Sequence, residues 1–262
     1  MAPANSVHGK LALVTGASGG IGAACCRDLA RAGFTVAIHY KQNHDAAAAL
    51  ARELRSIASG IEAGFSVRPE PLLIAADLST REGCDHIYET IKVHPSPLAV
   101  LVNNAGIVRD NPLFSASMDE LEETLRLNVH GTWYLSKRLA RLMIREKFGR
   151  IINISSVVGS TGNPTQSVYG MTKAAIDNFT KVAAQELAAH GILVNGVAPG
   201  FIDTDMTRDL SVEAKARLLE RIPLGRMGRP QEIAEIVGFL ATAGAYITGT
   251  TIHANGGLYG GA

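Results

Sequence analysis

The most constraining feature of this chain is a regular alternation of short apolar, β-branched segments with longer helix-like segments. Seven segments are predicted to be strands, at residues 11–16, 35–40, 71–78, 98–106, 149–156, 191–200 and 250–257. Helical patterns at 20–33 and 44–58 separate the first three strands. Continuous apolar runs are typical of strands that are covered on both faces. We therefore predict an α/β fold with a doubly wound, seven-stranded parallel sheet and helices on both faces.

Composition limits the kind of protein this is. The chain has 262 residues, 47% of them hydrophobic, a net charge of +1, and no linker or repeat, so residues 1–262 are expected to form a single domain. The balanced charge does not favour nucleic acid as a partner, and no apolar run reaches the ~18 residues of a membrane span. Cys25, Cys26 and Cys84 lack zinc spacing and suit a reducing compartment, so we expect a cytoplasmic protein without a metal site.

A glycine-rich turn directly follows the first strand. Glycine lets backbone amides approach a ligand closely, and the N-terminus of the next helix would face a pyrophosphate. The spacing is G-x-x-x-G-x-G rather than G-x-G-x-x-G, so its place between a strand and a helix carries the prediction. We expect a Rossmann-type cofactor site here, with contacts from Gly16, Ser18, Gly19, Gly20, Ile21 and Gly22.

The end of the second strand bears on the choice between NAD and NADP. An acidic residue there would bind the ribose 2′-hydroxyl and repel a 2′-phosphate. The chain has Tyr40 and Lys41 at this point, and its first acid is Asp45. Lys41 offers a cation, so NADP(H) is the predicted cofactor. The alternative is that Lys41 is a solvated loop lysine.

The next two strands end in further cofactor candidates. Ligands of open α/β sheets bind at the carboxyl ends of the strands. Asp77 can reach the adenine edge from the third strand, and "NNAG" at 103–106 supplies amides and a glycine from the fourth. The predicted contacts are Asp77, Leu78, Asn104, Ala105 and Gly106.

A tyrosine and a lysine stand four residues apart in "SVYGMTK", with a serine thirteen residues upstream of the tyrosine. Residues i and i+4 share a helix face, so Lys173 is expected to lie beside Tyr169 and to lower its pKa. Such a phenol can donate a proton to a carbonyl oxygen that receives a hydride. Ser156 can hold the same oxygen, and Lys173 can also reach the cofactor ribose.

These motifs, in this order, resemble the short-chain dehydrogenase/reductase family over residues 10–257. The resemblance implies that Ser156, Tyr169 and Lys173 are catalytic, with Asn128 in "LRLNVHGTW" as a fourth member. The thirteen-residue spacing selects Ser156 over the adjacent Ser155. The segment 199–206, "PGFIDTDM", resembles the one that closes over the nicotinamide, and it implies cofactor contacts from Pro199, Gly200, Ile202 and Thr204.

Within that family, "GIVRDNPLF" (106–114) and "ITGTTIHANGG" (247–257) resemble the 3-oxoacyl-(acyl-carrier-protein) reductases. These enzymes use NADPH to reduce a β-ketoacyl thioester, bind an acyl carrier protein and are typically homotetramers. Two departures stand out. Gly19 replaces a basic residue that commonly faces the 2′-phosphate, and Lys147 and His190 stand nearest to the positions of carrier-docking arginines.

The substrate pocket is predicted by position alone. We expect it to be lined by Ser156, Val157, Asn163, Gln166, Tyr169 and Met206. Three functions remain open: reduction of a β-ketoacyl thioester on acyl carrier protein or coenzyme A, reduction of a free ketone or oxidation of a free alcohol, and non-catalytic NADP sensing. Fold alone does not choose a substrate. The intact catalytic residues argue against the sensor.

The predicted helix over 166–191 carries small and apolar residues beyond the stripe needed to cover a sheet, including Ala174, Ala175, Phe179, Val182, Ala183 and Leu187. This excess predicts a subunit contact and agrees with the tetramer that the resemblance implies. The alternative is a helix buried within one chain.

Overall fold

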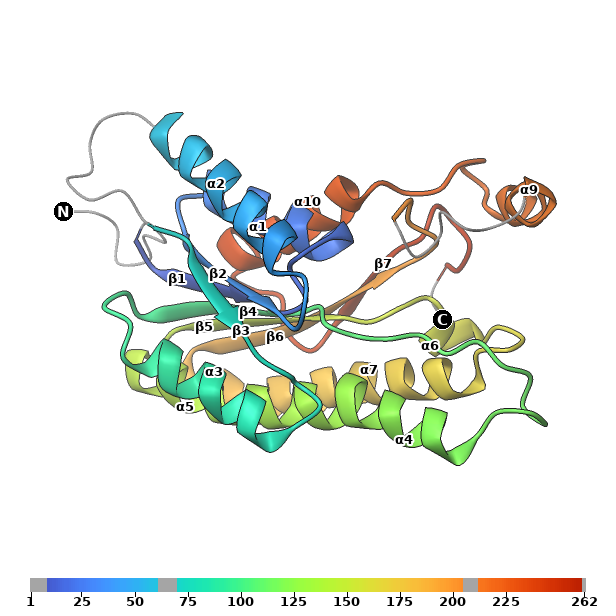
Figure 1. The fold of residues 1–262 in the computed structure, drawn as a ribbon, viewed down its shortest axis with the longest axis horizontal. Coiled ribbons are helices and arrows are strands. Elements are labelled where there is room, and N and C mark those ends of the chain that lie inside the picture. The colour runs from blue at the N-terminus through green and yellow to red at the C-terminus, as the bar shows by residue number, and fades with distance from the viewer. Residues whose placement is uncertain (1–8, 61–69, 205–211, 261–262) are drawn as a thin grey trace.

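The computed structural model describes residues 9–60, 70–204 and 212–260 (Figure 1). One parallel sheet of seven strands has the order β3-β2-β1-β4-β5-β6-β7. The chain therefore reverses direction across the sheet between β1 and β4, where open α/β sheets bind ligands. The strands are β1 (Leu11–Val14), β2 (Thr35–Tyr40), β3 (Leu72–Ala75), β4 (Leu98–Asn103), β5 (Gly149–Ile154), β6 (Ile192–Pro199) and β7 (Thr251–Ala254).

Helices cover both faces of the sheet. Figure 1 shows α1 (Gly20–Arg31), α2 (His44–Gly60) and α10 (Pro230–Thr242) on one side. The other side carries α3 (Arg81–Lys92), α4 (Met118–Leu125), α5 (Thr132–Glu146) and α7 (Ser167–Leu187). The shorter elements are a π-helical segment η1 (Arg126–Gly131), α6 (Val158–Thr161), a 3₁₀ turn η2 (Ala188–His190) and α9 (Val212–Arg221).

The core is divided by the sheet into two hydrophobic clusters. One lies under α1, α2 and α10 and includes Leu29 and Ile38, and the other lies under α3 and α5 and includes Leu101 and Met143. Every residue of β1, β2 and β4 is buried, as two-sided cover requires. The predicted seven-stranded parallel α/β fold is confirmed. Within the described residues, no helix is long and apolar enough to cross a bilayer.

Several predicted strands end earlier than expected. β1 stops at Val14 rather than at residue 16, β3 at Ala75 rather than 78, and β4 at Asn103 rather than 106. The residues that follow these strands turn out of the sheet and line a cleft. The segment 60–71 between α2 and β3 has no clear periodicity in the sequence and is expected to be a surface loop; it falls largely outside the described residues.

Candidate active site

A cleft of about 660 Å³ opens at the carboxyl ends of the strands. Its size is within the usual range for a cofactor or small-molecule site. It is lined by nearly all residues predicted to contact a cofactor: Gly16, Ser18, Gly19, Gly20, Ile21, Tyr40, Lys41, Asp77, Leu78, Asn104, Ala105, Gly106, Tyr169, Lys173, Pro199, Gly200, Ile202 and Thr204. Segments far apart in the sequence thus meet in one place.

Gly22 is the exception, because it lies behind the turn rather than on the cleft wall. A Cβ added to Gly22 would stand 2.5 Å from the Gly16 carbonyl oxygen and 2.6 Å from Asn104 Nδ2. The Asn104 amide also donates to the carbonyls of Thr15 and Gly16, at 2.9 and 3.0 Å. Gly22 therefore allows close packing of α1 against the turn, and its direct contact with a cofactor stays a prediction.

The N-terminus of α1 faces the cleft and is suited to bind an anion. Gly19 is the N-cap residue, in an extended conformation without a side-chain cap, and Gly20 follows with φ +52°. The first backbone N–H groups of the helix thus lack a side-chain cap. At the other end of the turn, Gly16 has φ +61°, and an added Cβ would stand 2.9 Å from Ala105 Cα. This cradle of glycines fits the pyrophosphate of a dinucleotide.

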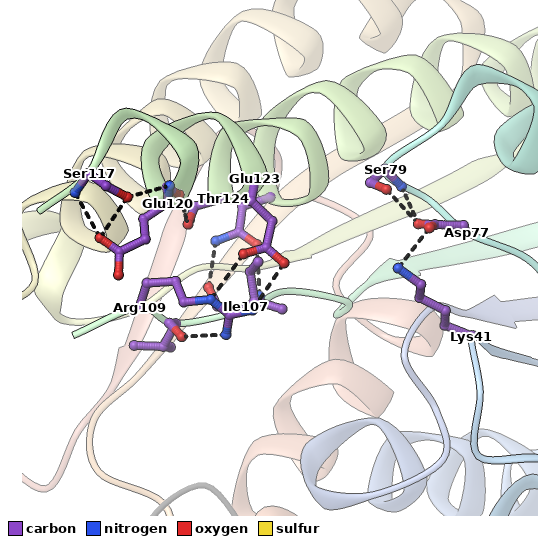
Figure 2. Close-up of polar contacts among 11 residues, drawn as sticks. Lys41, Asp77, Ser79, Ile107, Arg109, Ser117, Glu120, Glu123 and Thr124 are labelled. Carbon is purple, nitrogen blue, oxygen red and sulfur yellow. Dashed lines mark hydrogen bonds and ion pairs between the residues drawn. The ribbon is translucent and has the colours of Figure 1, made fainter. Parts of the chain in front are cut away.

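The far end of the cleft contains an ion pair between two predicted cofactor residues (Figure 2). Lys41 Nζ lies 2.7 Å from Asp77 Oδ2, and Ser79 donates to Asp77 Oδ1 from its backbone and its hydroxyl. Burial acts to raise the pKa of Asp77, but the hydrogen bonds from Lys41 and Ser79 outweigh it, so the pKa is lowered. Lys41 is a half-exposed cation on the cleft wall that already has a carboxylate partner.

Three of the four predicted catalytic residues, Ser156, Tyr169 and Lys173, line the cleft. Ser156 follows β5, and Tyr169 and Lys173 lie on α7, with Lys173 Nζ 5.5 Å from the centre of the Tyr169 ring. The Ser156 hydroxyl accepts from the Val158 N–H at 3.2 Å, and it lies close enough to Tyr169 to act on the pKa of that phenol. The adjacent Ser155 instead turns its hydroxyl to the Lys173 carbonyl, 3.3 Å away. Ser156 is thus the serine beside the tyrosine, at the position that the spacing predicts.

Asn128 lies behind this group, in the π-helical segment between α4 and α5. It exchanges two hydrogen bonds of 2.9 Å with the backbone of Ile107, and its amide also lies 3.2 Å from Thr172 Oγ1. A Cβ added to Gly106 would stand 3.2 Å from Asn128 Oδ1 and 3.8 Å from Lys173 Nζ. Asn128 and Lys173 therefore approach the same point. Single π turns are frequent at functional sites.

The pKa values of the two α7 residues differ from our expectation. Burial raises the pKa of Tyr169 to about 12, with Asp110 adding to the rise and the hydrogen bond with Ser156 opposing it. Burial also lowers the pKa of Lys173 to about 8, although Asp177 acts in the opposite direction. The predicted lowering of the tyrosine pKa by the lysine is wrong for this structure, because desolvation is the larger effect.

The predicted substrate residues are only partly brought together. Val157 and Gln166 line the cleft with Ser156 and Tyr169, and Gln166 Nε2 donates to Asp110 Oδ1 at 2.9 Å. Asn163 is not among the described residues that form the wall; its amide donates to Gln166 Oε1 at 3.1 Å. Met206 lies outside the described residues.

The segment after β4 forms one lip of the cleft and is held by α4 (Figure 2). Arg109 forms a two-pronged ion pair with Glu123, with both N···O distances 3.0 Å. Asn111 Nδ2 donates to Glu120, and its backbone N–H donates to the Thr165 carbonyl at 2.8 Å. Thr165 has φ +71°, an unusual value for a β-branched residue. The segment after β4 is thus joined directly to the segment that precedes α7.

Other cleft residues were not predicted. His39, Asp110 and Phe201 line the wall. Thr15 Oγ1 accepts the N–H groups of Asn104 and Ala105, each at 3.0 Å, and so shapes the fourth-strand segment from below. The positions of Thr15 and Phe201 directly after strands were a usable signal, but nothing in the sequence indicated the hydrogen-bond partners of Thr15 or His39.

Comparison with known proteins agrees with this geometry. The family model described as short chain dehydrogenase matches residues 10–215. The 3-oxoacyl-(acyl-carrier-protein) reductase of Pseudomonas aeruginosa is 44% identical, covering 97% of this chain and 99% of that protein. Its counterpart in Aquifex aeolicus is 42% identical, with coverage of 97% and 98%.

Solved structures give a second comparison. An NAD(P)-dependent gluconate 5-dehydrogenase from Beutenbergia cavernae, solved with bound NADP, has a TM-score of 0.87 at 32% identity and covers 97% of this chain and 98% of its own. A gluconate dehydrogenase from Agrobacterium tumefaciens has a TM-score of 0.89 at 28% identity, with 97% of each chain covered. Sequence, fold and cleft therefore agree that the chain belongs to the short-chain dehydrogenase family of oxidoreductases.

Proposed function

We propose that this protein is an NADPH-dependent reductase that converts a β-ketoacyl thioester, carried on acyl carrier protein, into the β-hydroxyacyl thioester. The observation that carries the proposal is that Ser156, Tyr169 and Lys173 line the same cleft as the glycine cradle. Relatives that match over nearly the whole chain are named as 3-oxoacyl-(acyl-carrier-protein) reductases.

The cofactor would be held along the cleft. The uncapped N-terminus of α1 at Gly19 and Gly20 suits the pyrophosphate, and Asp77 at the end of β3 suits the adenine. Lys41 supports NADP over NAD, since it supplies a cation where an acid would repel the 2′-phosphate. When bound, the cofactor supplies the hydride that the carbonyl carbon receives.

Tyr169 acts as the proton donor in this scheme. With a pKa of about 12 its phenol is protonated at neutral pH, so it enters the reaction in the form that can donate. The substrate oxygen becomes an alkoxide as its carbon gains a hydride. An alkoxide is more basic than a phenolate, so the phenol O–H bond breaks and the new O–H bond forms on the product. Ser156 donates a hydrogen bond to the same oxygen.

Lys173 and Asn128 assist the proton transfer without donating the proton to the substrate themselves. Lys173 is buried and its ammonium donates to the Ile154 carbonyl at 2.7 Å, which fixes its position beside the ring. A cation there stabilises the phenolate that is left after proton donation. Because its own pKa is lowered to about 8, Lys173 can also return a proton to Tyr169 near neutral pH. Asn128 keeps Ile107 and the lip of the cleft in place.

We propose that the acyl carrier protein binds at the C-terminal ends of α5 and α7. Tyr169 lies near the N-terminal end of α7. Lys147 ends α5 in a left-handed conformation, and a Cβ added to Gly191 would stand 2.4 Å from the Lys147 carbonyl oxygen. The close packing of Gly191 on Lys147 brings His190, the residue before Gly191, near Lys147 on the surface. These are the two positions nearest to those that the resemblance associates with carrier docking.

A free alcohol or ketone is the second candidate substrate. Two similar solved structures are named as gluconate dehydrogenases, and both cover 97% of this chain. A sugar-acid dehydrogenase would use the same proton donor in the reverse direction, so the cleft chemistry alone does not separate the two substrates.

The deciding experiment compares substrates and one matched pair of variants. Reduction of acetoacetyl thioesters on acyl carrier protein and on coenzyme A, and of a panel of free ketones, is measured with NADPH and with NADH. Oxidation of gluconate is measured beside it with NADP⁺ and with NAD⁺. Tyr169→Phe is expected to lower kcat by at least ~10²–10⁴. Tyr134→Phe makes the same chemical change on α5, where the hydroxyl bonds Asp85, and should retain activity. Near-normal turnover by Tyr169→Phe refutes the proton-donor role, and faster gluconate turnover refutes the thioester assignment.

We also propose the wider organisation of the protein. A sheet that holds all seven strands supports one dinucleotide-binding and catalytic domain over residues 1–262. Exposed Met171, Ala174 and Val182 on α7, with Trp133 on α5, support a homotetramer. Three free, buried cysteines support a cytoplasmic location.

A further inference from the structure

His39 is a buried histidine near the end of β2, with 3% of its surface exposed. Both of its ring nitrogens have partners. The backbone N–H of Gly16 points to Nδ1 at 3.1 Å, and Nε2 lies 3.1 Å from the Ala76 carbonyl oxygen. A carbonyl only accepts and an amide N–H only donates, so Nε2 carries the proton and Nδ1 is an acceptor. The geometry therefore selects one neutral tautomer.

These contacts lie where the strand pairing ends. The paired residues of β1 and β2 stop at Val14 and Ile38, and the glycine turn continues beyond them without a strand partner of its own. His39 supplies the hydrogen-bond acceptors that a paired strand would otherwise give to this turn. Its ring accepts from Gly16, and its backbone carbonyl accepts from Ala17 at 2.8 Å. Two successive residues of the turn are thus held by one residue of β2.

The same ring reaches the other end of the cleft. Ala76, whose carbonyl accepts from Nε2, immediately precedes Asp77, the partner of Lys41. One imidazole therefore joins the turn that cradles a pyrophosphate to the segment at the adenine end. A rotation of the ring would leave the partly buried Gly16 N–H without this acceptor, which is costly.

The protonation state agrees with this geometry. Burial lowers the pKa of His39 to about 4, while the Ala76 carbonyl and the charge of Asp77 act to raise it. Asp77 faces the ring from the end of β3, and its carboxylate is already paired with Lys41. His39 is consequently neutral at physiological pH, as the acceptor role of Nδ1 requires.

We propose that His39, as the neutral Nε2–H tautomer, is a positioning residue that holds the glycine turn in the shape that receives the cofactor pyrophosphate. The proposal rests on the proposed function in one respect, because it takes the cleft ligand to be a nicotinamide dinucleotide. A histidine that only fills the core would need the ring volume but neither polar contact.

Two substitutions separate these roles. His39→Asn keeps an acceptor oxygen close to the position of Nδ1 and loses the contact with Ala76. His39→Leu keeps a similar volume and removes both polar contacts. We expect His39→Leu to raise the Kd and KM for NADPH about tenfold, the scale of one buried hydrogen bond, and His39→Asn to restore most of that loss. The effect should fall on KM, with kcat at saturating NADPH changed less than about threefold.

A measurement on the unmodified protein removes the dependence on variant folding. ¹⁵N NMR of the imidazole without cofactor should show an unprotonated Nδ1 and a protonated Nε2 at pH 7. The opposite tautomer overturns the proposal, as does equal NADPH affinity for all three proteins or equal weakening in both variants. NADPH Kd is measured without any ketone. If the unmodified protein binds neither NADPH nor NADH, the proposed function fails, while the tautomer result still judges the His39 contacts separately.

Discussion

Gly22→Ala tests whether close packing of α1 against the glycine turn is required for cofactor binding. In an ordinary helix interior this change would stabilise the protein by up to about 1 kcal/mol through helix propensity. Here the new methyl carbon would lie 2.5 Å from the Gly16 carbonyl oxygen and 2.9 Å from Ala17 Cα. Both neighbours are backbone atoms, so the helix or the turn must move. Overpacking of this kind costs about 1–3 kcal/mol, which outweighs the gain.

The expected result is a net loss of about 1–2 kcal/mol, or about 2–8 °C in Tm for a chain of this size. Displacement of the turn should also weaken NADPH binding by roughly tenfold, as for one charge-assisted hydrogen bond. Tm is measured by calorimetry and Kd by titration of cofactor fluorescence.

Gly19→Ala is the matched control. Gly19 has an extended φ of −170°, and an added Cβ would meet no atom within 4 Å. Its Tm should stay within about 2 °C of the unmodified protein, the scale of a surface change. If Gly22→Ala and Gly19→Ala have the same Tm, the packing argument is wrong.

Three further outcomes are expected. Lys41→Ala should raise the KM for NADPH more than the KM for NADH, by about 1 kcal/mol, the scale of a charge-assisted contact. Steady-state kinetics with both cofactors measure this difference. A lower KM for NADH than for NADPH in the unmodified protein would contradict the NADP assignment. Because the pKa of His39 falls from 6.5 to about 4 on folding, the unfolded chain binds more protons between these values. Stability should therefore decrease as pH falls from 6.5 to 4, by up to about 1.4 kcal/mol per pH unit in urea titrations, and His39→Leu should flatten this slope. Dilution should lower specific activity together with the mass from light scattering, since α7 carries both Tyr169 and the exposed Val182; a fully active monomer would refute the tetramer.

The fold was predictable because it depends on local patterns. Apolar runs such as 98–103 and 149–154 are long enough to be strands, and burial on both faces leaves no polar alternation to confuse them. The ends of the strands were harder to predict. Residues such as Asp77 and Asn104 closely follow an apolar run in the sequence but lie outside the sheet and line the cleft, and where the strand ends depends on neighbours from other strands.

Much of the candidate site followed from the same logic, since residues after parallel strands meet at one edge. What the sequence did not give is how deeply a side chain is buried and which side chains it contacts. An i,i+4 spacing correctly places Lys173 beside Tyr169, but it does not give the burial that raises the tyrosine pKa. The pairing of Lys41 with Asp77 and the contacts of His39 join residues from different strands, and no spacing in the sequence indicates them.

The π-helical segment at Arg126–Gly131 also sets the rotational phase of α5. Thr124 before it and Met143 after it are both fully buried. The 19 positions between them make about 5.3 turns of a regular α-helix, which would point the two side chains in different directions, but one residue absorbed by the π turn leaves about 5.0. Deleting a single residue from this segment would turn α5 by about 100° and carry Leu135 and Leu139 away from the sheet. The wide turn that holds Asn128 thus also keeps two halves of one long helix facing the same way.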